Sequence, residues 1–168
     1  IVPAGVALAM EGQTRPHFFT GVATIVLKLF THIPANFAIF CEKDYQQLAV
    51  IRQMVRDLDL NITILAQPTI RETDGLALSS RNLYLSAADR KLAPLLYVEM
   101  QQTANQIAKG TPIDAALTSA KTRLTKAGFG KIDYFDLRHS DSLQPAETLV
   151  PNCRIFAAIW LGTTRLID

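Results

Sequence analysis

The sequence predicts an α/β protein in which part of a parallel sheet with crossover helices is followed by a small α+β domain. Helical and strand-like segments alternate with short connections up to residue 65, which favours a parallel sheet. The pattern changes after Asp74-Gly75, where two helical segments follow one another and strand-like segments come last. We therefore expect one domain over residues 1–77 and a second over residues 78–168.

Two helices and two strands are expected in the first domain. Apolar residues at helical spacing predict a helix over residues 19–32, and the apolar run 37–40 suits a buried strand. Asp44 stands where the N-cap of a second helix would be. The apolar face of that helix consists of Leu48, Ile51, Val55 and Leu58. Residues 62–65 read as another buried strand.

The second domain begins with helices whose ends carry capping signals. Ser86 to Asp89 resembles a capping box in which Asp replaces the usual Glu, and it predicts a helix over residues 87–108. Thr111-Pro112 supplies a cap and a first-turn proline for a further helix that stops at Gly128. The last segments read as strands, over residues 132–138, 154–161 and 164–167.

Composition excludes several classes of protein. Of the 168 residues 49% are hydrophobic and 19% are charged, which is typical of a globular chain, and the net charge of +2 without a basic run gives no support to nucleic-acid binding. The longest strongly apolar stretch, Ile155 to Leu161, is far shorter than the roughly 20 residues of a membrane span. No basic region precedes the apolar N-terminus and the two cysteines stand alone, so we expect a cytoplasmic protein. Because the chain opens on Ile1 instead of Met, we expect it to be a piece of something longer.

The first polar cluster, Cys41 to Gln47, follows the first predicted strand and opens the second helix. Ligands bind at the carboxyl ends of parallel strands, and a helix N-terminus there favours an anion. Lys43 adds a cation for phosphate, Asp44 could hold a metal or a hydroxyl, and Gln47 can face the same cleft from one turn further on. In the alternative interpretation, Asp44 is merely the N-cap, and Glu42 and Lys43 are solvated charges.

The second polar cluster, Gly75 to Asn82, carries two serines, an arginine and an amide after a flexible glycine. An arginine binds phosphate with two parallel hydrogen bonds, and Ser79 and Ser80 can donate to further oxygens. The alternative is a polar connector in which Ser80 or Asn82 makes turn hydrogen bonds. Together the two clusters suggest a nucleotide between two domains, although neither GxxxxGK[ST] nor GxGxxG occurs. No nucleophile motif accompanies the three histidines, so a catalytic triad is not expected.

At these clusters the sequence resembles the pantothenate synthetase (pantoate–β-alanine ligase) family, and the similarity extends over almost the entire chain. The segments that carry the resemblance are Met10-Glu11-Gly12, Glu42-Lys43-Asp44-Tyr45-Gln46-Gln47-Leu48, residues 71–82 (RETDGLALSSRN) and residues 160–168 (WLGTTRLID). The resemblance implies the C-terminal portion of a Rossmann-like nucleotidylyltransferase domain, followed by the small α+β domain.

The resemblance also implies an activity. Such enzymes use ATP and Mg²⁺ to convert pantoate into pantoyl adenylate, and β-alanine then attacks the acyl group to give pantothenate and AMP. The residues that match the family's ATP site are Cys41, Glu42, Lys43, Asp44, Ile70, Leu78, Ser79, Ser80 and Arg81. The position of Gln47 contacts pantoate, and Asp44 is a weak candidate for the metal. Charge that develops on the phosphates would be met by Lys43, Ser79, Ser80 and Arg81.

Several positions depart from the family pattern, among them Ala35 and Asn36, where the family has Pro-Asp. The family usually reads Arg-Pro-Gly-His-Phe-Arg, so that His17, Phe18 and Thr20 replace glycine, histidine and arginine. Cys41 stands where the family has a glycine, and it would cost strain and room if that backbone had a positive φ. The family's HxGH segment and a substrate-binding glutamine would precede residue 1. A non-catalytic remnant or nucleotide-binding module is therefore the alternative to an enzyme, and the 168 residues alone are expected to be inactive. Homodimers are usual in the family.

Overall fold

The computed structural model describes residues 1–168, and their contacts divide the chain into two compact units. Unit 1 comprises residues 1–69 and 141–143, and unit 2 comprises residues 70–140 and 144–168. The division after Thr69 lies eight residues before the expected boundary after Ala77. Residues 70–77 belong to unit 2 because Arg71 forms an isolated antiparallel β-bridge with Ala77 and an ion pair with Asp168.

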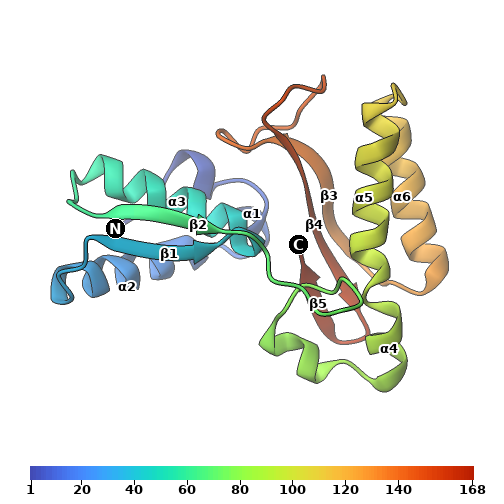
Figure 1. The fold of residues 1–168 in the computed structure, drawn as a ribbon, viewed down its shortest axis with the longest axis horizontal. Coiled ribbons are helices and arrows are strands. Elements are labelled where there is room, and N and C mark those ends of the chain that lie inside the picture. The colour runs from blue at the N-terminus through green and yellow to red at the C-terminus, as the bar shows by residue number, and fades with distance from the viewer. The chain divides into compact units, whose positions relative to one another are not determined.

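Unit 1 contains the two helices and the two parallel strands that the sequence predicts (Figure 1). Helix α2 (Phe18–His32) precedes strand β1 (Phe37–Cys41), and helix α3 (Tyr45–Asp57) carries the chain across to strand β2 (Thr63–Gln67). The register pairs Phe37 with Thr63 and Cys41 with Gln67. The carboxyl ends of both strands therefore lie at one edge of the sheet.

One face of this sheet packs against helices α2 and α3, and the side chains on the other face are exposed. Phe40 of β1 and Ile64 of β2 pack against a cluster from α2 and α3 that includes Ala23 and Ile51. On the other face, Phe37 is 61% exposed and Ile39 is 68% exposed. The apolar runs 37–40 and 62–65 were expected to be buried on both sides, and the structure corrects this because both helices cover the same face.

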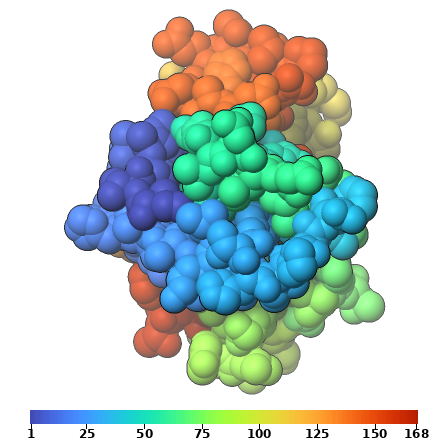
Figure 2. Space-filling model, turned by 90° about the vertical axis from the view of Figure 1, so that its left-hand side faces the viewer, coloured from blue at the N-terminus to red at the C-terminus, as the bar shows by residue number.

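Two short helices precede α2: η1 (Gly5–Ala7) and α1 (Glu11–Thr14). Ala7 packs with Phe19 of α2 and Val50 of α3. In the space-filling view the N-terminal residues, in dark blue, lie beside other residues of unit 1, in lighter blue and green (Figure 2). Gly12 allows this packing, because a Cβ there would lie 1.9 Å from the carbonyl oxygen of Ala7.

Unit 2 begins with the helical turn η3 (Ser80–Tyr84) and helices α4 (Ala87–Leu92), α5 (Leu95–Ala108) and α6 (Ile113–Ala127). Ser86 is the N-cap, as expected, since its hydroxyl accepts a hydrogen bond from the amide of Asp89 at 3.1 Å. The Asp89 carboxylate accepts from the Ser86 hydroxyl at 2.7 Å, whereas a full capping box has this carboxylate accept from the Ser86 amide. The single helix expected over residues 87–108 is two helices, because proline at 94 cannot continue the hydrogen-bond ladder. Helix α6 ends at Gly128 with φ +113°, as the sequence predicts.

The sheet of unit 2 is antiparallel in the order β3 (Ile132–His139), β4 (Cys153–Leu161) and β5 (Thr164–Ile167). Helices α5 and α6 pack against it through a core in which Phe135, Ala157 and Ile159 are fully buried. Neither sheet runs through both units. No helix of the chain is both long enough and apolar enough to span a membrane.

Candidate functional site

The first polar cluster lies where β1 ends. Strand β1 stops at Cys41, a single helical turn η2 (Glu42–Asp44) follows, and α3 begins at Tyr45. The amide groups of the first turn of α3 have no partners within the helix, so this end favours an anion. Asp44 is the N-cap residue, but its side chain makes no capping hydrogen bond. The interpretation of Asp44 as merely a capping residue therefore lacks the hydrogen bond that it requires.

Lys43 is the most unusual side chain of this turn. Only 9% of it is exposed, and its nearest acidic partner is the carboxylate of Asp44, at 3.8 Å. No hydrogen bond of the ammonium group occurs within the chain. Removing a charge from water is costly unless other charges or hydrogen bonds compensate. The geometry of Lys43 is thus suited to an anion that comes from outside the chain.

Cys41 does not strain the backbone. Its φ of −78° and ψ of 138° are ordinary extended values that any residue adopts. The strain expected from replacing a glycine at this position is absent, and only the extra volume of the side chain remains. The Cys41 thiol lies 3.9 Å from the carbonyl oxygen of Pro68, which it faces as a weak donor.

Gln46 is a residue of this turn that the sequence does not reveal. It is 4% exposed, and its amide nitrogen donates hydrogen bonds of 2.7 Å to the carbonyl oxygens of Val6 and Ala9. Its carbonyl oxygen accepts from the amide of Glu11 at 3.1 Å. Because these partners lie 35–40 residues earlier, no local pattern could predict the contact. The neighbouring Gln47, the expected pantoate residue, is half-buried in the first turn of α3.

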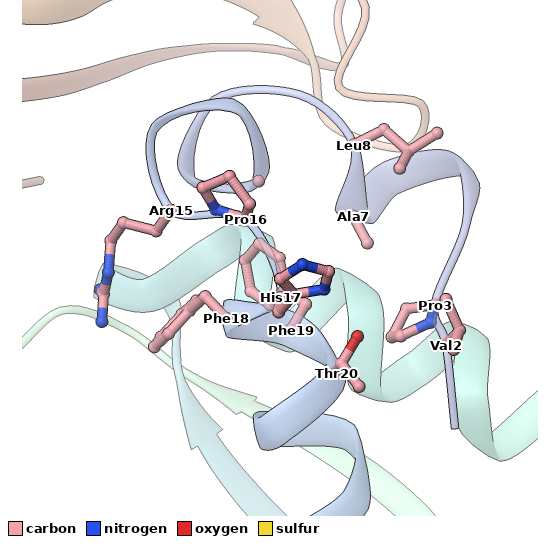
Figure 3. Close-up of a pocket in the computed structure, with 11 residues that line it drawn as sticks. Val2, Pro3, Ala7, Leu8, Arg15, Pro16, His17, Phe18, Phe19 and Thr20 are labelled. Atoms are coloured by element: carbon pink, nitrogen blue, oxygen red, sulfur yellow. The ribbon is translucent and has the colours of Figure 1, made fainter.

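A pocket of about 280 Å³ lies between the N-terminal segment and the start of α2 (Figure 3). Ala7, Leu8 and Gly12 line one side, and residues 17–20 line the other. The ring of His17 occupies the centre of the view. His17 has a φ of +69°, a conformation that glycine adopts freely and other residues rarely adopt. A glycine, which the resemblance implies for position 17, would adopt this conformation without strain.

Phe18 and Thr20, two other departures from the family pattern, also line this pocket. The Arg15 guanidinium lies 3.7 Å from the centre of the Phe18 ring, and Phe18 meets Phe19 edge to face. Thus the aromatic ring at position 18 is accommodated by a cation–π contact and an aromatic pair.

In unit 2, Arg71 holds the segment that leads into the second polar cluster. Its guanidinium forms two hydrogen bonds with the carboxylate of Asp168, at 2.5 and 2.7 Å, and lies 3.4 Å from the centre of the Tyr97 ring. Burial works against the charge of Arg71, but the Asp168 carboxylate outweighs it and the pKa of Arg71 is raised. The amide of Leu78 donates to the carbonyl oxygen of Ile70 at 2.9 Å, which closes this segment into a hairpin.

The second polar cluster is exposed. Ser79 is the N-cap of η3 and its hydroxyl accepts from the amide of Arg81 at 3.2 Å, whereas Ser80 and the Arg81 side chain are exposed. The guanidinium of Arg81 has no partner within the chain. Asn82 anchors the turn by donating to Glu72 and to the carbonyl oxygen of Ala77. Arg81 also lines a pocket of about 350 Å³ with Tyr84, Trp160, Thr163, Thr164 and Arg165.

The structure thus assembles each cluster inside its own unit. Cys41, Glu42, Lys43, Asp44 and Gln47 lie together in unit 1. Ile70, Leu78, Ser79, Ser80 and Arg81 lie together in unit 2. That both sets bind one ATP molecule stays a prediction.

Comparisons with known proteins identify the family. The model of the pantoate-beta-alanine ligase family matches residues 1–168. The chain belongs to this family. It is 53% identical to the pantothenate synthetase of Hahella chejuensis, over 100% of this chain and 59% of that protein. It is 49% identical to the pantothenate synthetase of Caulobacter vibrioides, over 98% of this chain and 59% of that protein.

Solved structures of the same family also match this chain. The crystal structure of pantothenate synthetase from Thermus thermophilus matches with a TM-score of 0.93 at 40% identity, covering 99% of this chain and 60% of that one. The pantoate-beta-alanine ligase of Francisella tularensis matches with a TM-score of 0.76 at 33% identity, covering 100% of this chain and 56% of that one. The latter structure is a complex with beta-gamma ATP and beta-alanine. The chain therefore spans about 59% of the length of the curated relatives named above.

Proposed function

We propose that this chain contributes the Lys43 turn and the Ser79–Arg81 loop to a pantoate–β-alanine ligase that forms AMP from ATP. The observation that carries the proposal is the buried Lys43 ammonium at the carboxyl end of β1, whose one acidic neighbour is 3.8 Å away. A phosphate would supply the charge-assisted hydrogen bonds that this ammonium lacks. The match of the whole chain to the ligase family supports the choice of ATP as the source of that phosphate.

The Ser79–Arg81 loop is proposed to bind the ATP phosphates as well. The Arg81 guanidinium is exposed and unpaired, so it can turn toward a ligand without breaking an ion pair. The Ser79 hydroxyl accepts a hydrogen bond from the Arg81 amide and can still donate one, and the exposed Ser80 hydroxyl is available too. Cys41, Glu42, Ile70 and Leu78 are proposed to line the same ATP site.

Asp44 is proposed to hold Mg²⁺. Mg²⁺ is commonly bound by one or two carboxylates together with substrate phosphates, so a single carboxylate beside the phosphate site suffices. The Asp44 side chain is 44% exposed and its acidic group faces only Lys43 at 3.8 Å, so it is accessible. No cluster of three or more His, Cys, Asp or Glu residues occurs that could hold a metal without such a substrate. The ion would neutralise part of the phosphate charge.

The proposed reaction has two steps. A carboxylate oxygen of pantoate, held by Gln47, attacks the α-phosphorus of ATP, and the bond to pyrophosphate breaks. The amine of β-alanine then attacks the acyl carbon, loses a proton and displaces AMP. In the first step Lys43, Ser79, Ser80 and Arg81 would donate to the phosphate oxygens on which charge develops.

The competing proposal is a nucleotide-binding protein without ligase activity. The departures at His17, Phe18, Thr20 and Cys41 favour it. The ordinary backbone of Cys41 counts against it, because the residue fits its turn without strain.

The experiment is an assay of AMP release by the complete natural polypeptide that carries these residues. We expect release that requires ATP, pantoate and β-alanine together, and that falls steeply in Lys43→Met. Lys28→Met is the matched control, because Lys28 is an exposed lysine of α2. ATP binding without AMP release in the unmodified protein would favour the competing proposal.

The 168 residues alone are proposed to release no AMP at a useful rate. Alignment of bound reactants can contribute up to about 7–11 kcal/mol to catalysis, and it depends on the residues that hold each reactant in place. The curated relatives are longer than this chain, which matches 59% of the first of them. Turnover by the 168-residue chain itself would contradict this proposal. A homodimeric, cytoplasmic state of the complete polypeptide is proposed from the family resemblance.

A further inference from the structure

The Gln46 side chain makes three hydrogen bonds to one segment of the chain, residues 6–11. Both amide protons bind carbonyl oxygens at 2.7 Å, those of Val6 and Ala9, and the Gln46 carbonyl oxygen accepts from the amide of Glu11 at 3.1 Å. The side chain is almost completely buried, so water cannot replace these bonds. A surface glutamine on a helix would make no such set of contacts.

The segment that Gln46 holds has an unfavourable backbone conformation. Met10 has a φ of +47° with a ψ of −108°, values that residues with a side chain rarely adopt. Such conformations persist only where the surroundings enforce them. The three hydrogen bonds of Gln46 bracket Met10, since they end on Ala9 and Glu11 as well as on Val6.

Gln46 lies next to Gln47, in the first turn of α3. Lys43 lies in the turn η2, directly after the end of β1, where Cys41 pairs with Gln67 of β2. Gln47 lies beyond that turn, so the orientation of its side chain depends on how the first turn of α3 is anchored. That anchor is the contact between Gln46 and residues 6–11.

We propose that Gln46 is a positioning residue, which locks the first turn of α3 to residues 6–11 and so orients the Gln47 amide toward pantoate. The choice of pantoate rests on the proposed function. The same contact sets one wall of the 280 Å³ pocket, because Ala7 belongs to the anchored segment and lines the pocket (Figure 3).

Hydrogen exchange tests the anchor directly, because the Glu11 amide donates to Gln46. In the complete polypeptide, Gln46→Met keeps a side chain of similar length and removes all three hydrogen bonds. We expect exchange at Glu11 to rise more than tenfold. Gln53→Met is the matched control on the same helix, since the Gln53 side chain makes no hydrogen bond within the chain, and it should leave this exchange unchanged. Unchanged protection at Glu11 in Gln46→Met would overturn the proposal.

Calorimetric titrations with pantoate and with ATP then separate positioning from general loss of structure. We expect Gln46→Met to weaken pantoate binding more than tenfold and ATP binding less than threefold. Equal weakening of both, or no weakening of pantoate binding, would overturn the positioning role. If Gln46→Met does not fold, Gln46→Glu replaces it, because it keeps the acceptor for Glu11 and loses both donors. Failure of the unmodified protein to bind pantoate would instead contradict the proposed function, and the exchange at Glu11 would still decide whether the anchor exists.

Discussion

The two sheets of the molecule differ in how completely this chain covers them. In unit 2, Phe135 of β3 and Ala157 and Ile159 of β4 are fully buried beneath α5 and α6. In unit 1, Phe37 and Ile39 of β1 are mostly exposed, because α2 and α3 pack on the same face. Parallel sheets are generally covered on both faces. Unit 2 therefore has its own closed core, whereas the 168 residues cover only one face of the sheet of unit 1 and span 59% of the length of the relatives named above.

The same difference bears on the two polar clusters. Lys43 lies at the end of the open sheet, yet its side chain is nine-tenths buried. Arg81 belongs to the unit with the closed core, yet its side chain is exposed. The burial of the Lys43 and Arg81 side chains therefore does not follow from whether helices cover both faces of the neighbouring sheet. Lys43 is held by the turn η2, and Arg81 extends from the exposed turn η3.

The largest expected effect comes from exchanging one phenylalanine in each sheet for alanine. Phe135→Ala should lower the free energy of unfolding by about 3–5 kcal/mol, because it opens a cavity in the core of unit 2. Phe37→Ala is the matched variant in unit 1 and should change it by less than about 0.5 kcal/mol, because the ring is exposed. Urea denaturation of the 168-residue chain measures both. Equal losses would show that the face of β1 is covered after all.

A second pair of variants tests the source of stability in unit 1. Gly12→Ala should cost about 3 kcal/mol, because its Cβ would meet the carbonyl oxygen of Ala7 at 1.9 Å. Gly21→Ala is the control in α2, where a Cβ meets nothing within 4 Å, and it should stabilise the chain by about 0.5–1 kcal/mol. Urea denaturation midpoints of the two variants measure both changes. An unchanged midpoint for Gly12→Ala would mean that the N-terminal segment does not pack against α2 and α3 as described.

Smaller effects are expected at the N-caps of the two units. Ser86→Ala should cost about 1 kcal/mol, since the Ser86 hydroxyl caps α4 at the amide of Asp89. Asp44→Ala should leave the free energy of unfolding almost unchanged, because its side chain caps nothing. Thermal unfolding of both variants checks the contrast. A larger loss for Asp44→Ala would restore the interpretation of Asp44 as a structural cap.

The last contrast between the units concerns pH. Burial of Asp133 favours its neutral form, but the hydrogen bonds from Arg165 and Lys131 outweigh burial, and the pKa of Asp133 is lowered. A lowered folded-state pKa gives stability that is present above the unfolded value, about 3.9, and lost as pH falls through the folded value. Asp133→Asn should therefore flatten the decline of stability below about pH 4. Asp57→Asn, at an exposed position in unit 1, should leave the decline unchanged.

The sequence predicts the fold well wherever structure depends on local patterns. Helical spacing, the Ser86 cap and the glycine at 128 identify elements that the structure contains. The break at Pro94 was not predicted, although proline is itself a local signal, and the N-cap of α6 is Pro112 instead of the expected Thr111. The exposure of Phe37 does not follow from residues 37–40 alone, because an apolar run does not reveal which of its faces the helices cover.

The features of the candidate site that depend on local sequence could also be predicted, and those that depend on distant residues could not. Lys43 and Arg81 are apparent from residue type and from their places at element ends. The burial of Lys43 and the contacts of Gln46 depend on residues far along the chain, and no spacing reveals them. The left-handed backbone of His17 is likewise a property of the folded turn.

The phosphate-binding role of Lys43 is tested most directly by a calorimetric titration of the complete polypeptide with ATP. We predict that Lys43→Met weakens ATP binding by about 10–100-fold, the equivalent of about 1.5–3 kcal/mol for a charged hydrogen bond. Lys28→Met, which removes an exposed charge from α2, should bind ATP as the unmodified protein does. Equal ATP affinity in the Lys43→Met variant and the unmodified protein would contradict the claim that the buried ammonium is the phosphate site.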